Sequence, residues 1–386
     1  MTASPIFLDY HAHGPLDPEV AQVLTAAFAE FDVNPHSGSL AAERARIAVE
    51  AARAEVAALV RVPPSSLIFT SGATEANNLV FAGLAAALQA AGRPRIIVSA
   101  IEHPSVLAAA DRLGDQFDVQ RAPVRRDGLI DLEALERLAT PQTGLISVAA
   151  ANHEIGVVQP LASIVTLARK CGAFFHTDAA QAAGKIALDL SEVDLASLSA
   201  HKLHGPFGIG ALHARRPVQK QLQPLLVGGA QEKGLRSGTA PVPLCVAFGA
   251  AARLADQARQ ENALRVGALR DRLLKGLLAI GDVTLNGDVQ RRLPGNLNLC
   301  FAGVDAEALV MRLRADVVIS TGSACTSASL EPSPVLQALG LERQVAETAV
   351  RLGLGRFTTQ AEVETAIVRI TKAVAELRAV GQRAVA

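Results

Sequence analysis

The feature that most constrains the fold of this chain is an alternation of short apolar runs with longer helical stretches. Five runs are predicted to be buried strands: Leu67–Thr70, Arg95–Ser99, Leu145–Ala149, Ala173–Thr177 and Asp194–Ser199. Helices are expected between them, near residues 73–90, 104–113, 131–139 and 160–171. This alternation is typical of an α/β domain with a mostly parallel sheet, in which functional groups gather at the carboxyl ends of the strands.

The pattern changes near residue 255. A charged amphipathic stretch at 255–280 precedes two further predicted strands, Val283–Leu285 and Asn296–Phe301, and helices near 305–314 and 360–380. A chain of 386 residues suits one large and one small domain. We expect a large α/β domain at 15–255, and a smaller α+β domain formed by 1–14 and 256–386.

The charge balance narrows the possible partners. Lys and Arg together number 37, as do Asp and Glu, so the formal net charge is zero. A dedicated nucleic-acid or membrane-surface binder needs a basic excess, which this sequence lacks. The N-terminus shows no charged-then-apolar leader, and no apolar run has the length of a membrane span. The sequence therefore predicts a cytoplasmic protein with neither nucleic-acid nor membrane partners.

Cysteine and histidine spacing gives no sign of a metal site. The four cysteines are far apart and form no CxxC pair: Cys171, Cys245, Cys300 and Cys325. Neither a disulfide framework nor a cysteine zinc site is expected. Two histidine pairs could be interpreted as metal ligands: His11 with His13, and His201 with His204. No acidic or cysteine partner accompanies either pair at ligand spacing, so no metal is expected.

Three polar clusters follow predicted strands. Residues 70–78 open a helix, whose exposed amides favour an anion, although a capped helix without a ligand has the same pattern. Asp178 follows a strand of apolar residues, where a carboxylate needs a cationic partner. Lys202 could form a Schiff base if desolvated, or could be a surface lysine before a turn. Together, the three groups match the phosphate, ring nitrogen and aldehyde of pyridoxal 5′-phosphate (PLP).

The segment Ser320–Ser329 places Cys325 among nine small residues. No large apolar side chain anchors this segment, so we expect a surface loop. A thiol on such a loop can collect a group at one site and deliver it at another. A plain serine-rich loop with an incidental cysteine has the same composition.

Over nearly its whole length, the sequence resembles the cysteine desulfurases of the NifS/IscS type, which are class V aminotransferase-like PLP enzymes of fold type I. The matching segments are Leu8–Tyr10, Phe69–Glu75, Glu102–His103, Glu154–Val158, Asp178–Gln181, His201–Lys202, Gly234–Thr239, Gly322–Pro332 and Arg351–Thr358. The long Gly322–Pro332 segment is similar to that of group I of the family. The resemblance implies a PLP-dependent homodimer that converts L-cysteine to L-alanine and passes sulfur to an acceptor protein, either an iron–sulfur scaffold or a thiolation enzyme.

The resemblance also implies which residues bind the cofactor. Lys202 is expected to hold PLP covalently and to transfer protons, and Asp178 to keep the pyridine nitrogen protonated. Gln181 is expected to contact the ring oxygen, and His103 to stack on the ring and take part in catalysis. The phosphate is expected to lie against four residues: Ala73, Thr74, Ser199 and His201.

Further implied roles concern the substrate and the second subunit. Arg351 is expected to clamp the substrate carboxylate, a bidentate task that suits a guanidinium, and Asn152 to lie beside the substrate. Thr239 is expected to reach the phosphate in the neighbouring subunit. Cys325 is expected to attack the substrate sulfur, which leaves alanine and a persulfide on the protein.

Three segments depart from the family pattern, one of which is Asn34–Ser39, which lacks the family's usual following histidine and glycine pattern. Residues 12–15 read Ala-His-Gly-Pro where the family has Ala-Thr-Thr-Pro near the substrate, and residues 152–154 read Asn-His-Glu where it has Asn-Asn-Glu. His153 thus replaces an asparagine that contacts the cofactor, and its charge could change near neutral pH. Two alternatives stay open: a related PLP lyase or aminotransferase acting on another amino acid, and a weakly active sulfur-relay or regulatory homologue.

Overall fold

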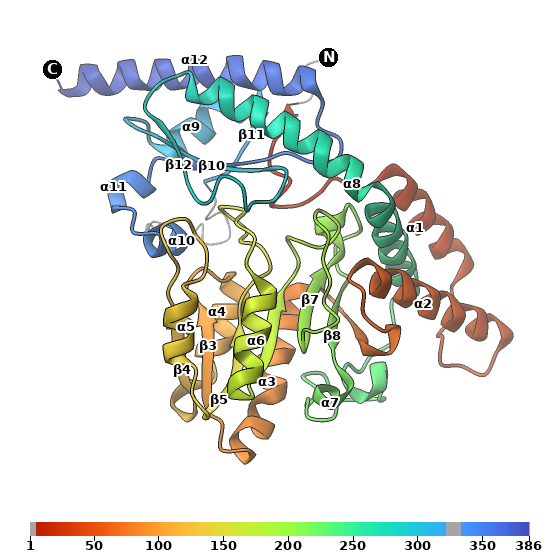
Figure 1. The fold of residues 1–386 in the computed structure, drawn as a ribbon. Coiled ribbons are helices and arrows are strands. Elements are labelled where there is room, and N and C mark those ends of the chain that lie inside the picture. Colours follow the sequence, from red (N-terminus) through yellow and green to blue (C-terminus); the bar gives the residue numbers. More distant parts are fainter. Residues whose placement is uncertain (1–4, 322–332, 386) are drawn as a thin grey trace.

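The computed structural model describes residues 5–321 and 333–385, and a seven-stranded sheet forms its centre (Figure 1). The strands are β2 (Leu67–Thr70), β3 (Arg95–Ser99), β4 (Asp118–Ala122), β5 (Thr143–Ser147), β6 (Phe174–Asp178), β7 (Leu195–Ser199) and β8 (Gly210–Ala214). Their order across the sheet is β2-β8-β7-β6-β5-β3-β4. The neighbours from β7 to β4 are parallel, whereas β8 is antiparallel to both β2 and β7. The predicted mostly parallel sheet is confirmed.

Helices bury both faces of this sheet because neighbouring strand residues point to opposite sides. Ile96 and Val98 on β3 pack in one hydrophobic cluster, and Ile97 packs in the other. One face is covered by α3 (Ala73–Ala90), α4 (Pro104–Asp111) and α7 (Arg216–Gln219). The other face is covered by α2 (Leu40–Leu59), α5 (Leu132–Leu138), α6 (Leu161–Cys171) and the first part of α8 (Val242–Leu278). Helix α1 (Pro18–Glu30) begins after its Asp17 cap and packs on α8. Short 3-10 turns lie at Pro64–Ser66, Gly114–Gln116, Ala200–Leu203 and Glu232–Gly234.

A second, smaller assembly follows in the chain. Strands β9 (Val283–Leu285), β10 (Asn296–Phe301) and β12 (Ala349–Gly353) form an antiparallel sheet, and β1 (Ile6–Phe7) pairs with β11 (Val317–Val318). The helices are α9 (Ala306–Leu313), α10 (Pro334–Ala338), α11 (Arg343–Ala346) and α12 (Gln360–Val385). Among the described residues, no helix combines the length and the apolarity that a membrane span requires.

Several elements match the sequence predictions and others do not. The bounds of β2, β3, β9 and β10 are as predicted, and β5, β6 and β7 are displaced by no more than two residues. Strands β1, β4, β8, β11 and β12 and helices α1, α7, α10 and α11 were not predicted. Strand β4 (Asp118-Val-Gln-Arg-Ala122) is polar because it lies at the sheet edge, so it has no apolar run to reveal it.

Helix α8 links the two assemblies. It is one continuous helix of 37 residues, about 55 Å long, and it begins at Val242 rather than near 255. Its first part packs in the large hydrophobic cluster, and its residues from Val266 onward pack with Leu8, β10 and α12. The change from one cluster to the other therefore falls inside a helix. The division into domains at 255 stays a prediction.

The contact between α8 and α2 is unusually close at Gly249. A Cβ atom on Gly249 would lie 2.7 Å from the Cα of Ala52 and 2.8 Å from its Cβ. A Cβ atom on Gly267, in the same helix, would meet nothing within 4 Å. The two glycines offer a matched pair of positions for testing the helix packing.

We predict opposite effects on stability for the two glycines. Gly249→Ala should lower the free energy of unfolding by about 1–3 kcal/mol, because the backbones of α2 and α8 must separate. Gly267→Ala should raise it by about 0.5–1 kcal/mol through a better helix propensity. Urea denaturation of both variants measures the difference. Equal stability of the two variants would contradict the close α2–α8 packing.

Candidate active site

A cavity of about 450 Å³ lies at the carboxyl ends of the parallel strands. Its lining comes from the ends of β6 and β7, the start of α3, the N-terminal segment and β12. It contains ten of the residues predicted from the sequence: Ala73, Thr74, His103, His153, Asp178, Gln181, Ser199, His201, Lys202 and Arg351. Residues that are up to 278 positions apart in the chain, Ala73 and Arg351, thus share one cavity.

Three predicted residues do not line this cavity. Asn152 is buried, and its side chain holds a turn: Nδ2 donates to the Ile101 carbonyl at 2.7 Å, and Oδ1 accepts from the amides of Glu154 and Ile155. The geometry therefore gives no support to direct contact between Asn152 and a substrate. Thr239 is exposed, on the loop before α8. Cys325 lies outside the described residues.

Asp178 is a buried carboxylate that has only neutral hydrogen-bond partners. Its side chain accepts hydrogen bonds from Asn77 Nδ2 at 2.9 Å and from the Ala180 amide at 3.0 Å. No ion pair among the described residues includes it. Because a buried charge needs compensation, this position suits a cationic ligand group such as a protonated pyridine nitrogen.

A chain of hydrogen bonds connects Asp178 to His103. Asn77 donates to Asp178 and also to Ser105 Oγ, which lies 2.7 Å from His103 Nδ1. The Ser105 amide donates to the same Nδ1 at 3.1 Å, so the neutral imidazole carries its proton on Nε2. Burial lowers the pKa of His103, and the Lys202 charge lowers it further against the opposing effect of Asp178. Asn77 and Ser105 were not predicted, since only the fold brings them to Asp178.

The start of α3 forms a cradle for an anion. No side chain caps this helix, and a Cβ atom on Gly72 would meet nothing within 4 Å, so the space over the first turn is open. The N–H groups of a helix start favour a phosphate. Beside this cradle, Ser199 Oγ and His201 Nδ1 are 2.8 Å apart. Burial, followed by the Lys202 charge, lowers the pKa of His201 to about 4, so its imidazole is neutral at pH 7.

Lys202 is directed toward the N-terminal segment. Its Nζ donates to the carbonyls of His11 and Ala12, each at 2.6 Å. Ala12 begins the segment 12–15, where the sequence departs from the family pattern, and His11 immediately precedes it. The amine is thereby held at the boundary of the cavity.

Arg351, in β12, is buried and lines the same cavity. Its Nη2 pairs with Asp9 at 2.8 Å, and its Nη1 donates to the His153 carbonyl at 3.0 Å. Its Nε has no hydrogen-bond partner among the described residues. A buried guanidinium with an unused donor can bind a carboxylate that enters the cavity.

His153 faces His103, with ring centroids 5.2 Å apart. Its Nε2 lies 3.6 Å from the Glu154 carboxylate. Burial lowers the pKa of His153 well below its ordinary value, and repulsion from His103, when that imidazole is protonated, and from Arg351 lowers it further. This contradicts the expectation that His153 changes charge near neutral pH, because burial moves its titration into the acid range. Among the described residues, no group of three His, Cys, Asp or Glu side chains could hold a metal ion.

The fold and this cavity are those of a fold-type I PLP enzyme. The model of the aminotransferase class-V family matches residues 6–365. The mitochondrial cysteine desulfurase of Eremothecium gossypii is 47% identical over 97% of this chain and 77% of its own length. The cysteine desulfurase IscS of Rickettsia bellii is 44% identical over 97% of this chain and 92% of its own length.

Solved structures agree with these relatives. A NifS-like protein superposes with a TM-score of 0.90 at 32% identity, over 96% of this chain and all of the other. SspA in complex with cysteine gives a TM-score of 0.81 at 33% identity, over 92% of this chain and all of the other. The chain belongs to the class-V aminotransferase family and, within it, to the cysteine desulfurases. Its cofactor is PLP, and the uncompensated Asp178, the open start of α3 and the Lys202 amine fit that group.

We predict that His153 affects the cofactor only in acid. The wild-type imidazole is neutral at and above about pH 7, as the amide of His153→Asn is, because its folded-state pKa lies below the ordinary value. As the pH falls, wild-type protein gains a positive charge beside His103 and the variant does not. The visible absorption of the PLP-loaded proteins should therefore coincide in neutral and alkaline buffer and diverge in acid. The exposed His36→Asn is the control, and a difference confined to alkaline pH would refute this prediction.

Proposed function

We propose that this PLP-dependent cysteine desulfurase transfers the sulfur of L-cysteine to Cys325 as a persulfide and then to an acceptor protein. The single observation that supports the PLP chemistry best is the uncompensated carboxylate of Asp178 in the same cavity as Lys202 and Arg351. The two alternatives, another PLP lyase and a weakly active relay protein, are not favoured, since the relatives named above are cysteine desulfurases.

PLP supplies an electron sink that stabilises negative charge on the substrate carbon. Asp178 would hold the positive ring nitrogen, and the helix start at Ala73 and Thr74 would hold the phosphate. Arg351 would bind the substrate carboxylate and so fix the orientation of the thiol group. Lys202 would move the proton that leaves the substrate α-carbon, since its Nζ lies at the edge of the same cavity.

The sulfur step would involve Cys325. Its thiolate would attack the substrate sulfur, so that an S–S bond forms while the substrate C–S bond breaks. The electron pair of that bond stays with the substrate, whose β-carbon gains a proton and ends as the methyl group of alanine. Because neutral His103 carries its proton on Nε2, we propose that it supplies the proton that the β-carbon gains. Transfer of the outer sulfur to an acceptor thiol then restores Cys325.

Both residues that flank the Cys325 segment are tied to the cavity wall. The backbone of Ser320 pairs with Arg351, and its Oγ donates to Asp9 at 3.2 Å. On the other side, Ser333 Oγ donates to the Glu154 carboxylate at 2.6 Å. Cys325 is five residues from Ser320, so an extended chain can carry it no more than about 18 Å away. These anchors support the proposal that the Cys325 thiol can reach a substrate whose carboxylate is bound by Arg351.

We further propose a homodimer in which Thr239 reaches the phosphate of the neighbouring subunit. Thr239 is exposed and outside its own cavity. Three consecutive apolar residues upstream, Leu225–Val227, are 40%, 45% and 82% exposed. An exposed apolar run of this kind is suited to a protein interface. The cytoplasmic location and the identity of the acceptor stay predictions.

Lys202→Ala is predicted to abolish the covalent link to PLP. Wild-type protein should be yellow, and borohydride should bleach its visible band and fix the cofactor on the peptide that contains Lys202. The variant should have no reducible band, because no other described lysine lines this cavity. Lys170→Ala, at an exposed position, is the control. Cofactor fixed on a different lysine in wild-type protein would show the assignment to be wrong.

Cys325→Ser is predicted to keep the cofactor and to lose sulfide release. After exposure to L-cysteine, mass spectrometry of wild-type protein should find about 32 Da, one sulfur atom, on the Cys325 peptide. Cys171→Ser is the control, since Cys171 is the partly exposed cysteine among the described residues. Release of sulfide by Cys325→Ser at the wild-type rate would exclude Cys325 as the carrier.

A further inference from the structure

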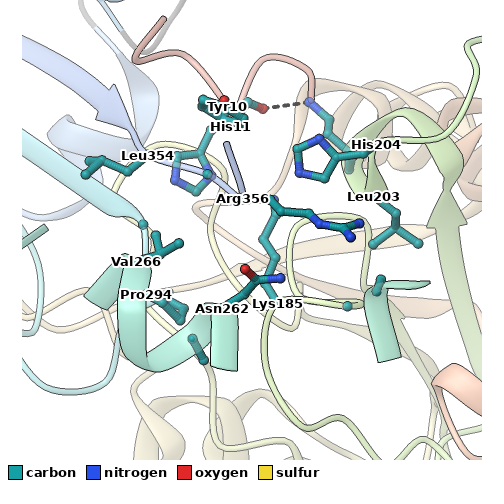
Figure 2. Close-up of a pocket in the computed structure, with 16 residues that line it drawn as sticks. Tyr10, His11, Lys185, Leu203, His204, Asn262, Val266, Pro294, Leu354 and Arg356 are labelled. Carbon is teal, nitrogen blue, oxygen red and sulfur yellow. Dashed lines mark hydrogen bonds between the residues drawn. The ribbon is translucent and has the colours of Figure 1, made fainter. Parts of the chain in front are cut away.

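A second, smaller cavity of about 70 Å³ lies beside the first (Figure 2). His11 and Lys202 line both cavities and so form the wall between them. The polar residues around the small cavity include Tyr10, Lys185, His204, Asn262 and Arg356, as Figure 2 shows. Of these, Lys185 lines the same cavity as Lys202, the proposed cofactor lysine. Lys185 has no role in the proposed mechanism.

Gln181 joins Lys185 to the carbonyl that binds Lys202. Its Nε2 donates to the His11 carbonyl at 2.9 Å, so its Oε1 must be the acceptor end. Lys185 Nζ donates to this Oε1 at 3.1 Å, and His11 Nδ1 donates to it at 3.2 Å. The same His11 carbonyl accepts from Lys202 Nζ at 2.6 Å. Both amines are therefore bound to one rigid unit, made of Gln181 and His11.

The orientation of Gln181 also fixes the state of His11. Because Nδ1 carries the proton, Nε2 is an acceptor, and it has no partner in the described structure. His11 is only 2% exposed, and burial lowers its pKa well below the ordinary value, helped by the charge of Lys185. His11 is thus neutral and adds no charge of its own between the two amines.

No ion pair among the described residues includes Lys185. Arg356, which lines the small cavity, is itself paired with Asp17 at 2.7 Å. The other groups around the small cavity are neutral or cationic: Tyr10, His11, Lys202, His204 and Arg356. In the larger cavity the carboxylate is Asp178, and Arg351 adds a further positive charge. Burial, then the charges of Lys202 and Arg351, lower the pKa of Lys185 to about 7.

We propose that Lys185 is a positioning residue whose ammonium, held on Gln181 beside Lys202, weakens the binding of protons by the Lys202 nitrogen. Two like charges in a desolvated site repel, so a proton on one amine makes a proton on the other less stable. A lysine that transfers protons near neutral pH needs this kind of depression. The inference rests on the proposed function, in which Lys202 carries PLP.

The visible band of the bound cofactor gives a readout that does not depend on turnover. Its pH midpoint should rise in Lys185→Met by on the order of one pH unit, because the neighbouring positive charge is gone. It should not rise in Lys185→Arg, which keeps that charge at every pH. Lys170→Met, at an exposed position paired with Glu136, should leave the midpoint unchanged. Equal midpoints for wild-type protein and Lys185→Met, both with cofactor bound, would overturn the inference.

Lysine side-chain NMR of the wild-type holoprotein tests the same point without relying on a neutral variant. The chain has seven lysines, so ¹³Cε labelling gives few signals: Lys170, Lys185, Lys202, Lys220, Lys233, Lys275 and Lys372. The signal that disappears in Lys185→Arg should titrate near neutral pH, well below the exposed Lys170. Titration of Lys185 together with the exposed lysines would also overturn the inference.

Different results would exclude the proposed function and the proposed role of Lys185. If borohydride fixes no cofactor on Lys202, the proposed function is wrong, whatever Lys185 does. If the cofactor is fixed there but Lys185→Met leaves the midpoint in place, the proposed function survives and the role of Lys185 is lost.

Discussion

The site depends on how the N-terminal segment is fixed between the two parts of the fold. The Asp9 carboxylate pairs with Arg351 of the small sheet, and the Gly14 amide donates to the His201 carbonyl at 2.9 Å, beside the cofactor lysine. Between them, the carbonyls of His11 and Ala12 hold Lys202. Arg351, the proposed substrate-binding residue, and Lys202, the proposed cofactor lysine, do not contact each other directly in the described structure. The short backbone stretch from Asp9 to Gly14 contacts both and therefore sets the distance between them.

Burial lowers the pKa values of the histidines in the site more than neighbouring charges do. Four imidazoles around the amine have pKa values shifted down, with burial as the largest cause each time: His11, His103, His153 and His201. They act as neutral donors or acceptors at pH 7. The positive charges of the site at pH 7 are therefore those of lysine and arginine side chains. The buried Asp178 carboxylate remains available to pair with the cofactor. His153, which distinguishes this sequence from its family pattern, is therefore neutral at pH 7 because burial lowers its pKa.

Local patterns in the sequence predicted the strands that are apolar throughout and the residues that stand at their ends. Ten of the predicted residues line the cavity because parallel strands bring their carboxyl ends to one edge. The pattern could not reveal the start of α8 at Val242, where Pro241, Pro243 and the buried Cys245 stand in place of a charged repeat. Nor could it assign Asn77 or Lys185, whose partners become neighbours only in the folded chain. The place of Asn152 beside the substrate stays a prediction, because its side chain is used to hold a turn, which its polar motif did not reveal.

The ion pair between Asp9 and Arg351 has a consequence for the newly made chain. The two residues are 342 positions apart. At about 5–20 residues per second, the ribosome needs roughly 17 to 70 s to add the second residue after the first. During that interval the large sheet can form. The N-terminal segment, whose carbonyls bind Lys202, cannot yet be fixed by the ion pair of Asp9 with Arg351, because Arg351 has not been added to the chain. The enzyme therefore completes its active site last, and a cofactor that arrives early meets a pocket with one wall still missing.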